Sequence, residues 1–258
     1  MSILIQGGEK IFNSGNRIIN TWLYPIQDGF VLIDTGYENG FKHFKKRISK
    51  FNIKIKDIRY IFLTHAHDDH VGFLNQILDE SPNTKIVMHD KALEILYKGQ
   101  NSFIGGCNSR TAFLFCQIMK LFGKGEHSFS PLKQEFEKRC ILVSDKNRKE
   151  IEKELNGKII DTPGHTYDSI SLLIDDGVLF CGDSAMNGFP STHKITIFAE
   201  SKLEFIQSWK TIINTKPKMI YPGHGKPFEY SKLEQNLIYV NKINLYPLHN
   251  SKDIHRFL

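Results

Sequence analysis

The sequence lacks any apolar run of the roughly 20 residues that a membrane-spanning helix needs. The nearest candidate, residues 113–119, is short and lies between Arg110 and Lys120. The first nine residues carry neither a basic region nor a long apolar stretch, so they do not resemble a signal peptide. We therefore expect a cytoplasmic protein with no membrane partner.

Cysteine is also scarce. The four cysteines form no C-x-x-C pair, which excludes the usual zinc knuckle and the usual redox dithiol; they are Cys107, Cys116, Cys140 and Cys181. Scattered thiols in a chain without a secretory signal are expected to stay reduced.

An excess of acidic charge is absent too, because the formal net charge of the 258 residues is +6. A basic chain attracts anionic partners. However, the lysines of segments 42–58, 133–158 and 202–242 alternate with acids, as on solvated helix faces. Nucleic acid is therefore disfavoured as a partner.

Short β-rich runs alternate with helical ones, which predicts a layered α/β protein. Strands are expected at 18–25, 29–33, 58–63, 85–88, 158–161, 169–174, 178–181 and 218–221. Helices are expected at 39–51, at 70–79 and at 201–214, where Ser201 and Glu204 could form a capping box.

The two series of elements resemble each other. "DGFVLIDTG" (28–36) and "DGVLFCGDS" (176–184) both run from a turn through a buried strand to an aspartate. "IRYIFLTHAH" (58–67) and "PKMIYPGHG" (217–225) both run from a buried strand into a histidine loop. Two similar halves would place these polar residues at the same edge of a core, where neighbouring strand ends form a cleft.

Residues 91–157 separate the halves and are rich in phenylalanine, with glycine breaks at 105–106 and at 123 and 125. We interpret this segment as a helical, lid-like insertion over the cleft. Its aromatics favour helix packing or a homo-oligomer interface over an apolar pocket.

The motif "THAHDDH" (64–70) follows the apolar stretch 60–63 and crowds three imidazoles and two carboxylates into one loop. Imidazole nitrogens and carboxylate oxygens are the ligands that borderline divalent metals accept. One run cannot enclose a metal, so remote ligands are required. His165 in "DTPGHT", Asp183 in "FCGDS" and His224 in "YPGHG" each follow a strand and can supply them.

Seven ligands are too many for one tetrahedral ion and suit two ions, one held by three histidines and one by an aspartate and two histidines. The remaining carboxylate would bridge. The other histidines are expected to be structural or exposed (His43, His127, His249, His255) or to have a smaller prospect of lining the cleft (His89, His193).

These motifs, with "LIDTG" upstream, resemble those of the metallo-β-lactamase-fold hydrolase superfamily across nearly the whole chain. The resemblance implies one domain over 1–258, folded as a four-layer αββα sandwich with metals at the edge of two sheets. It implies that His65, His67 and His165 hold one metal and that Asp69, His70 and His224 hold the other, with Asp183 bridging. Asp34 would lie behind the metals and orient a ligand.

The resemblance also implies two divalent ions, zinc by default, with iron and manganese compatible with the same ligands. A metal-bridging hydroxide would attack the substrate, and Asp69 would help to position it as a catalytic residue. No serine or cysteine nucleophile is required, and Cys181 is expected to pack in the core.

Departures from related subfamilies narrow the substrate. True metallo-β-lactamases carry cysteine or serine at the place of Asp183, and diiron relatives carry glutamate at the place of His67. Glyoxalase II-like thioesterases add a helical C-terminal domain, but only a short tail follows His224. Acyl-homoserine lactonases carry a tyrosine where Met186 stands. Tyr167 and Asp168 replace the Pro-Gly of many relatives and could add side chains to the cleft, together with Met186 and His193.

We therefore predict a hydrolase of small-molecule esters, thioesters or lactones. A phosphodiesterase or nuclease of the same fold is the alternative, because relatives with these ligands cleave phosphodiesters and the chain is basic. A non-catalytic metal-binding protein is a third interpretation, which the intact ligand set disfavours.

Overall fold

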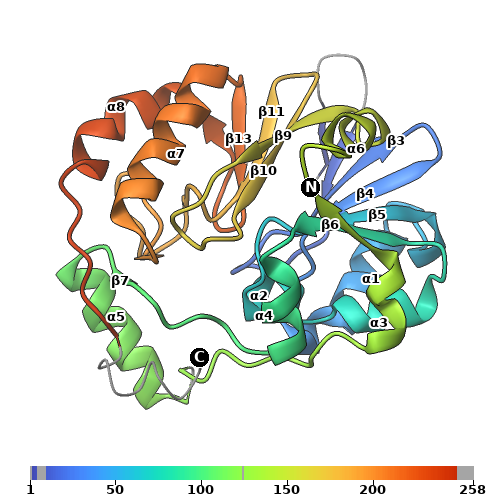
Figure 1. Ribbon diagram of the computed structural model, residues 1–258, viewed down its shortest axis with the longest axis horizontal. Helices are drawn as coiled ribbons and strands as arrows, with labels where there is room; N and C mark the ends of the chain where they lie inside the picture. Colours follow the sequence, from blue (N-terminus) through green and yellow to red (C-terminus); the bar gives the residue numbers. More distant parts are fainter. Residues whose placement is uncertain (1, 5–9, 124, 249–258) are drawn as a thin grey trace.

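The computed structural model describes residues 2–4, 10–123 and 125–248 of the chain. Two mixed sheets face each other, with helices on their outer faces (Figure 1). The first sheet has seven strands in the order β1 (Ser2–Leu4), β2 (Lys10–Asn13), β3 (Trp22–Ile26), β4 (Gly29–Ile33), β5 (Ile58–Phe62), β6 (Lys85–His89) and β8 (Cys140–Val143). The second has five, in the order β14 (Phe228–Glu229), β13 (Met219–Pro222), β11 (Val178–Gly182), β10 (Ile170–Ile174) and β9 (Gly157–Asp161).

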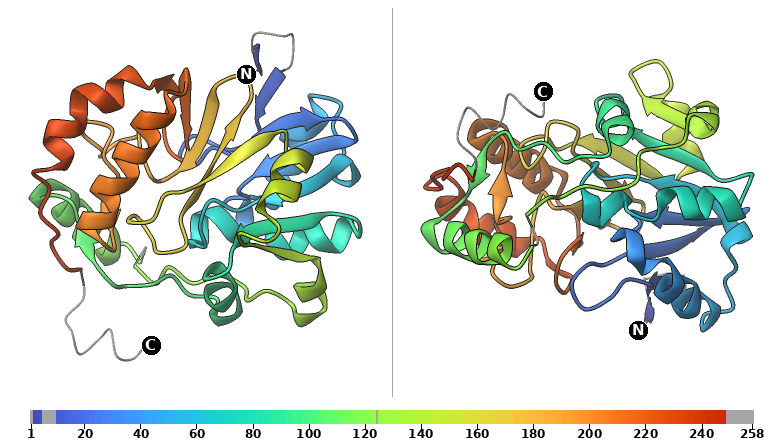
Figure 2. Two further views of the ribbon diagram at one scale, coloured as in Figure 1. Left: turned by 45° about the horizontal axis from the view of Figure 1, so that its top comes forward. Right: turned by 90° about the horizontal axis from the view of Figure 1, so that it is seen from below.

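The helices complete the layers, as the further views in Figure 2 also show. The first half of the chain contributes α1 (Phe41–Ser49), α2 (Asp68–Val71), α3 (Leu74–Glu80) and α4 (Ala92–Lys98), with the 3-10 turns η1 (Glu38–Gly40) and η2 (Ile55–Asp57). The second half contributes α6 (Arg148–Glu154), α7 (Lys202–Thr215) and α8 (Ser231–Val240).

Three apolar clusters fill the three spaces between these layers. One joins the first sheet to its helices, with Phe44, Ile77 and Ile61 among its members. A second lies between the sheets and includes Val31, Phe62 and Phe180. The third joins the second sheet to α7 and α8. Each strand alternates its side chains between the faces of its sheet, so a sheet covered on both sides needs apolar residues at nearly every position. The αββα sandwich is therefore confirmed.

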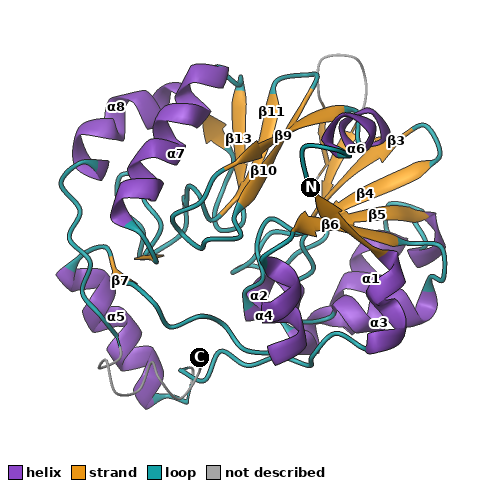
Figure 3. Ribbon diagram, in the orientation of Figure 1, coloured by secondary structure: helices purple, strands orange, loops and turns teal. Residues whose placement is uncertain are grey.

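The similarity of the two halves is visible in their pairing. β3 and β4 are antiparallel and β4 and β5 parallel, while β10 and β11 are antiparallel and β11 and β13 parallel. The strands that precede each polar motif thus end at one edge of the sandwich, where Figure 3 shows loops and the short helix α2.

Most expected strands and helices are present with shifts of one or two residues. Two differences have a local cause. The strand expected from Ile18 begins only at Trp22, because the chain before it forms a loop in which Ser14 and Thr21 are hydrogen-bonded. The helix expected at 70–79 is split at Gly72 and Phe73 into α2 and α3.

The interpretation of residues 91–157 as one helical insertion was wrong at its ends. α4 packs against β6, the short apolar run Cys140–Val143 pairs with β6 as an edge strand, and α6 packs beside β9. A four-residue strand inside a charged, aromatic segment is too short to give a periodic signal. What departs from the sandwich is the part that carries β7 (Gly106–Cys107) and α5 (Arg110–Leu121), whereas η3 (Gln134–Arg139) packs on the sandwich through Phe136. That the departing part acts as a lid stays a prediction.

β7 pairs with β12 (Phe198–Ala199) to form a two-stranded sheet that connects this departing part to the second half of the chain. The four cysteines are free, as expected. Within the described ranges no helix has the length and apolar character to cross a membrane. The cytoplasmic location stays a prediction, and His249 and His255 lie outside the described residues.

Candidate metal centre

The polar motifs meet where four strands end. β5 delivers His65 and His67, and Asp69 and His70 lie in the short helix α2 that follows. β9, β11 and β13 are followed by His165, Asp183 and His224 respectively. All seven side chains are buried or half-buried. The structure therefore brings together every residue that the sequence suggested as a metal ligand.

The first group is made of three imidazoles. His165 Nε2 lies 3.2 Å from His65 Nε2 and 3.2 Å from His67 Nδ1. The ligand atoms of these three residues all lie within 4.8 Å of one another. This spacing is that of nitrogens around one shared ion.

Their hydrogen bonds show where the protons are. His165 Nδ1 donates to the carbonyl of Phe198 at 2.8 Å, so the neutral ring has its lone pair on Nε2. The Thr64 hydroxyl donates to Asp34 Oδ2 at 2.7 Å and is therefore an acceptor for His65 Nδ1 at 3.0 Å, which leaves the lone pair of His65 on Nε2. Two lone pairs that face each other across 3.2 Å repel, unless a cation lies between them.

The pKa values of these imidazoles agree with neutral rings. Burial first, and then the neighbouring imidazoles, holds the pKa of His65 and His67 well below the usual range. Burial also lowers the pKa of His165, although Asp183 opposes it. Neutral imidazoles are the form that binds metals.

The second group contains Asp69, His70 and His224, again with ligand atoms within 4.8 Å of one another. His224 Nε2 lies 3.1 Å from Asp69 Oδ2, and its Nδ1 donates to the carbonyl of Ile18 at 2.8 Å. His70 Nδ1 donates to Asp34 Oδ2 at 2.7 Å. The Nε2 of His70 is buried and has no hydrogen-bond partner among the described residues.

Asp183 lies between the two groups. One oxygen is 3.4 Å from His224 Nε2 and 3.8 Å from His165 Nε2, while the other is 3.6 Å from His70 Nε2. A carboxylate that reaches both groups has the placement of a bridging ligand.

Carboxylates change the proton affinity of the second group. Burial lowers the pKa of His70, but Asp69, Asp34 and Asp183 outweigh it and raise that pKa to about 10. The pKa of His224 is raised to about 9, because Asp183 and Asp69 outweigh burial in the same way. A proton and a metal ion therefore compete for the same nitrogens.

Asp34 lies directly behind these ligands. Its Oδ1 accepts from the Thr64 amide at 2.7 Å, and its Oδ2 accepts from the Thr64 hydroxyl and from His70. Asp34 has a φ of +56°, a conformation that aspartate tolerates better than most residues. It thus orients His70 directly and His65 through Thr64.

Two glycines let these elements approach each other. Gly182 has a φ of +50°, and a Cβ there would lie 2.2 Å from the Thr64 hydroxyl. At Gly223 a Cβ would lie 2.6 Å from Asp183 Oδ1 and 2.7 Å from His70 Cε1. A side chain at Gly182 would displace Thr64, and one at Gly223 would push Asp183 and His70 apart.

Three residues that the sequence linked to the substrate cleft have different surroundings. Tyr167 is 39% exposed, and the ammonium of Lys91 lies 5.7 Å from its ring centre. Met186 is buried, so it has little surface to offer a substrate. His193 stacks on Tyr239 of α8 with ring centres 3.7 Å apart, which gives it a packing role away from the centre.

Asp168 does not line a cleft either. It is buried, and its Oδ2 accepts from the amide of Ala66 at 2.8 Å, between His65 and His67. The carboxylate of Glu200 accepts from the Tyr167 amide at 2.6 Å in the same way. No local pattern pointed to Glu200, because its contact with Tyr167 spans 33 residues.

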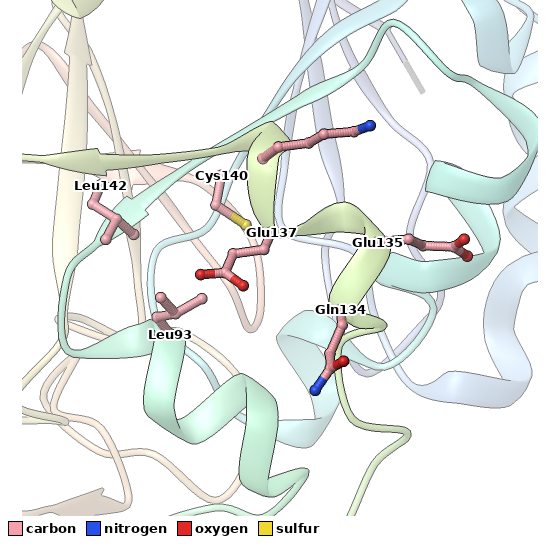
Figure 4. A pocket seen from close by; sticks show the side chains of 7 residues that line it. Leu93, Gln134, Glu135, Glu137, Cys140 and Leu142 are labelled. Carbon is pink, nitrogen blue, oxygen red and sulfur yellow. The ribbon is translucent and has the colours of Figure 1, made fainter.

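The described surface also has a pocket of about 600 Å³ that contains none of these residues. Figure 4 shows Leu93, Glu137, Cys140 and Leu142 around it, where α4, η3 and β8 meet. Its carboxylates outnumber its single lysine, Lys138, and it contains no histidine, so it is not an extension of the candidate centre.

The chain belongs to the metallo-beta-lactamase superfamily, whose family model matches residues 14–224. It is 27% identical over 211 residues to a beta-lactamase-like protein 2 homolog of Drosophila melanogaster, a match that covers 81% of this chain and 59% of that protein. It is 28% identical over 218 residues to a probable metallo-hydrolase of Methanocaldococcus jannaschii, with 79% and 88% covered. The chain thus spans less than two thirds of the Drosophila relative.

Solved structures show the same fold. An archaeal metallo-beta-lactamase superfamily protein from Sulfolobus tokodaii aligns with a TM-score of 0.58 at 20% identity, over 96% of this chain and 93% of that one. A metallo-beta-lactamase from Cronobacter sakazakii aligns with a TM-score of 0.61 at 16% identity, over 93% and 91%.

Proposed function

We propose that this protein is a hydrolase with a binuclear metal centre. One ion would be held by His65, His67 and His165. The other would be held by Asp69, His70 and His224, and Asp183 would contact both ions. The observation that carries the proposal is the pair of unprotonated nitrogens of His65 and His165, buried and facing each other at 3.2 Å. Only a cation or an added proton makes that contact favourable, and their low pKa values disfavour the proton.

When bound, two divalent ions supply an activated water and polarise the group it attacks. Zinc suits the nitrogen-rich set, and iron and manganese accept the same ligands. The chain itself fixes the geometry. Asp34 and the Phe198 carbonyl hold three imidazoles in the tautomer that binds metal, and we assign Asp69 the positioning of the attacking water.

We propose an acyl substrate, namely a small-molecule ester, thioester or lactone. Two features support it. Asp183 stands between the two groups of ligands, where it can contact both ions. Cys181 is buried in the third cluster and burial raises its pKa, so this thiol is not available as a separate nucleophile. The name of the Methanocaldococcus relative, a probable metallo-hydrolase, agrees with hydrolysis in general.

The test is a substrate panel on protein loaded with zinc, iron or manganese. We expect hydrolysis of an activated ester, a thioester or a lactone that is lost in the His165→Ala variant. The control is His43→Ala, because His43 is exposed on α1 and belongs to neither group of ligands. Metal-replete protein that is inert to all three substrates would refute the proposal.

A phosphodiesterase or nuclease is the second candidate, favoured by the net charge of +6. Bis-p-nitrophenyl phosphate, assayed beside the acyl panel, separates the two. Faster cleavage of the phosphodiester than of every acyl substrate would replace the first candidate by the second.

A further inference from the structure

One acid of the "THAHDDH" motif has no place among the metal ligands. Asp68 points instead to the chain after α4. Asn101 Nδ2 donates to Asp68 Oδ1 at 2.7 Å, and the Asp68 amide donates to Asn101 Oδ1 at 2.8 Å. His127 Nδ1 lies 3.3 Å from the same Asp68 Oδ1. Asp68 therefore connects Asn101 and His127, which lie on either side of β7 and α5 in the chain, to the loop that carries His67 and Asp69.

Both the backbone and the ring of His127 have contacts with the chain after α4. Its carbonyl accepts from the Asn101 amide at 3.1 Å and from Gln100 Nε2 at 3.0 Å, and its ring meets Phe103 edge-on with centroids 6.4 Å apart. The side chain is 43% exposed, so it is reachable by a substrate. His127 is thus exposed, as expected, and its side chain is also engaged by Asp68.

His127 carries a directed proton donor. Asp68 accepts, so Nδ1 holds a proton and the second nitrogen, Nε2, is the one that is available. No hydrogen bond to Nε2 occurs within residues 2–4, 10–123 and 125–248. The bond to Asp68 is the main reason that the pKa of His127 is raised, which favours the imidazolium.

The contact with Asp68, which stands between His67 and Asp69 in the chain, places His127 beside the candidate centre. Asp68 and Asp69 face it from α2, and the Cys116 thiol faces it from α5. His127 is in turn among the groups that lower the pKa of His67, whose ring belongs to the first ligand group. His127 is thus held next to the loop that carries His67 and Asp69, and a general acid for a substrate at the centre has to come from such a position.

We propose that His127 is a catalytic residue that donates the proton of Nε2 to the leaving oxygen of the substrate, and that Asp68 positions its ring. The inference rests on the acyl-hydrolase function proposed above and narrows its substrates to esters or lactones of aliphatic alcohols. An alkoxide is about as basic as hydroxide, whose conjugate acid has a pKa of about 15.7, so it leaves poorly without a proton. A thiolate, with a pKa of about 8.5 for its thiol, leaves without one.

The step balances. Hydroxide from water forms a bond to the carbonyl carbon, and the bond from that carbon to the leaving oxygen breaks. The electron pair stays on that oxygen, which takes the Nε2 proton of His127 and departs as the alcohol. The acid product and the initial ionisation of water release protons, one of which reprotonates His127. The sum is ester plus water giving carboxylate, alcohol and one proton.

The experiment compares leaving groups. Metal-loaded wild type and the His127→Gln variant are assayed on a p-nitrophenyl ester, an ethyl ester and a thioester of the same acid. We expect kcat/KM for the ethyl ester to fall about 100- to 1,000-fold, the usual contribution of a general acid, and to fall less than about 3-fold for the other two. His43→Ala is the matched control and should leave all three values unchanged.

A second variant separates proton donation from a structural role. Asp68→Asn removes the carboxylate that raises the pKa of His127, so the alkaline limb of the ethyl-ester profile should move to lower pH, with bound metal measured to show that the centre is intact. Equal losses on the three substrates, or no loss in His127→Gln, would overturn the inference and leave the proposed function standing. A wild type inert to all three would overturn both.

Discussion

His65 Nε2 and His165 Nε2 lie 3.2 Å apart, although each ring has its proton on the opposite nitrogen. Such a contact is unfavourable by itself, since two lone pairs meet where no water fits between them. The chain holds it in place because His65 Nδ1 donates to the Thr64 hydroxyl and His165 Nδ1 donates to the Phe198 carbonyl. The folded protein therefore carries local repulsion that a cation removes.

Metal removal should consequently destabilise the protein. We expect two equivalents of transition metal per chain by elemental analysis, and a melting temperature that falls on chelation and recovers when metal is restored. A ligand at 1,000 times its Kd stabilises the folded state by about 4 kcal/mol. His43→Ala should keep both equivalents, whereas His165→Ala should lose at least one. Purified protein without bound metal, and with a melting temperature insensitive to added metal, would contradict this prediction.

Asp34→Asn tests the residue behind the ligands. Asparagine tolerates the positive φ of this position, so the backbone should be unchanged while His70 loses a charged acceptor. We expect metal affinity to fall about 10- to 100-fold, as for other partners of ligating histidines. Competition with a chromophoric chelator measures it, with Asp28→Asn in the exposed turn as the control. Unchanged affinity would show that Asp34 does not orient His70.

Glu200 should give stability a pH dependence. Burial raises the pKa of Glu200 from 4.5 to about 7, so the folded state holds a proton that the unfolded state releases. This contribution is complete below pH 4.5 and is lost as the pH rises through 7. The slope approaches about 1.4 kcal/mol per pH unit. The free energy of unfolding, measured with urea, should change less between pH 5 and 8 in Glu200→Gln than in wild type. The variant Glu234→Gln, at an exposed position, should follow wild type. Parallel curves for all three proteins would exclude this role.

Trp209 lies beside Asp183, the ligand that we propose to bridge the two ions. It is fully buried on α7, and its Nε1 donates to the carbonyl of Ser184 at 2.8 Å, next to Asp183. Trp209→Ala should cost about 3–5 kcal/mol of unfolding free energy, because it leaves a cavity and an unpaired carbonyl. Leu203→Ala, on the same helix but 79% exposed, should change it by less than about 0.5 kcal/mol. Similar urea midpoints for the two variants would contradict the assignment.

Local patterns predicted most of the fold. A strand such as Val178–Gly182 is buried at every position, and the helix Lys202–Thr215 begins after its Ser201 cap, so each is encoded within its own stretch. The reciprocal half of the predicted capping box is missing, because the Ser201 amide donates to the Gly164 carbonyl. The strand Cys140–Val143 was missed because four residues are too few to give a periodic signal.

The ligand set followed from the sequence because each ligand comes directly after a strand, and strand ends of one sheet meet at one edge. Asp168, Glu200 and His127 could not be found this way. Each acts through a contact with a distant segment, to Ala66, Tyr167 and Asp68 respectively.

The sequence alone determined which side chains could bind a metal, since that depends on residue type and on position along a strand. Only the tertiary structure decided which nitrogen of each histidine carries its proton, and that Asp68 faces His127 and no ligand group. Those properties depend on hydrogen-bond acceptors brought from other parts of the chain, and burial makes each such bond decisive because no water competes for it.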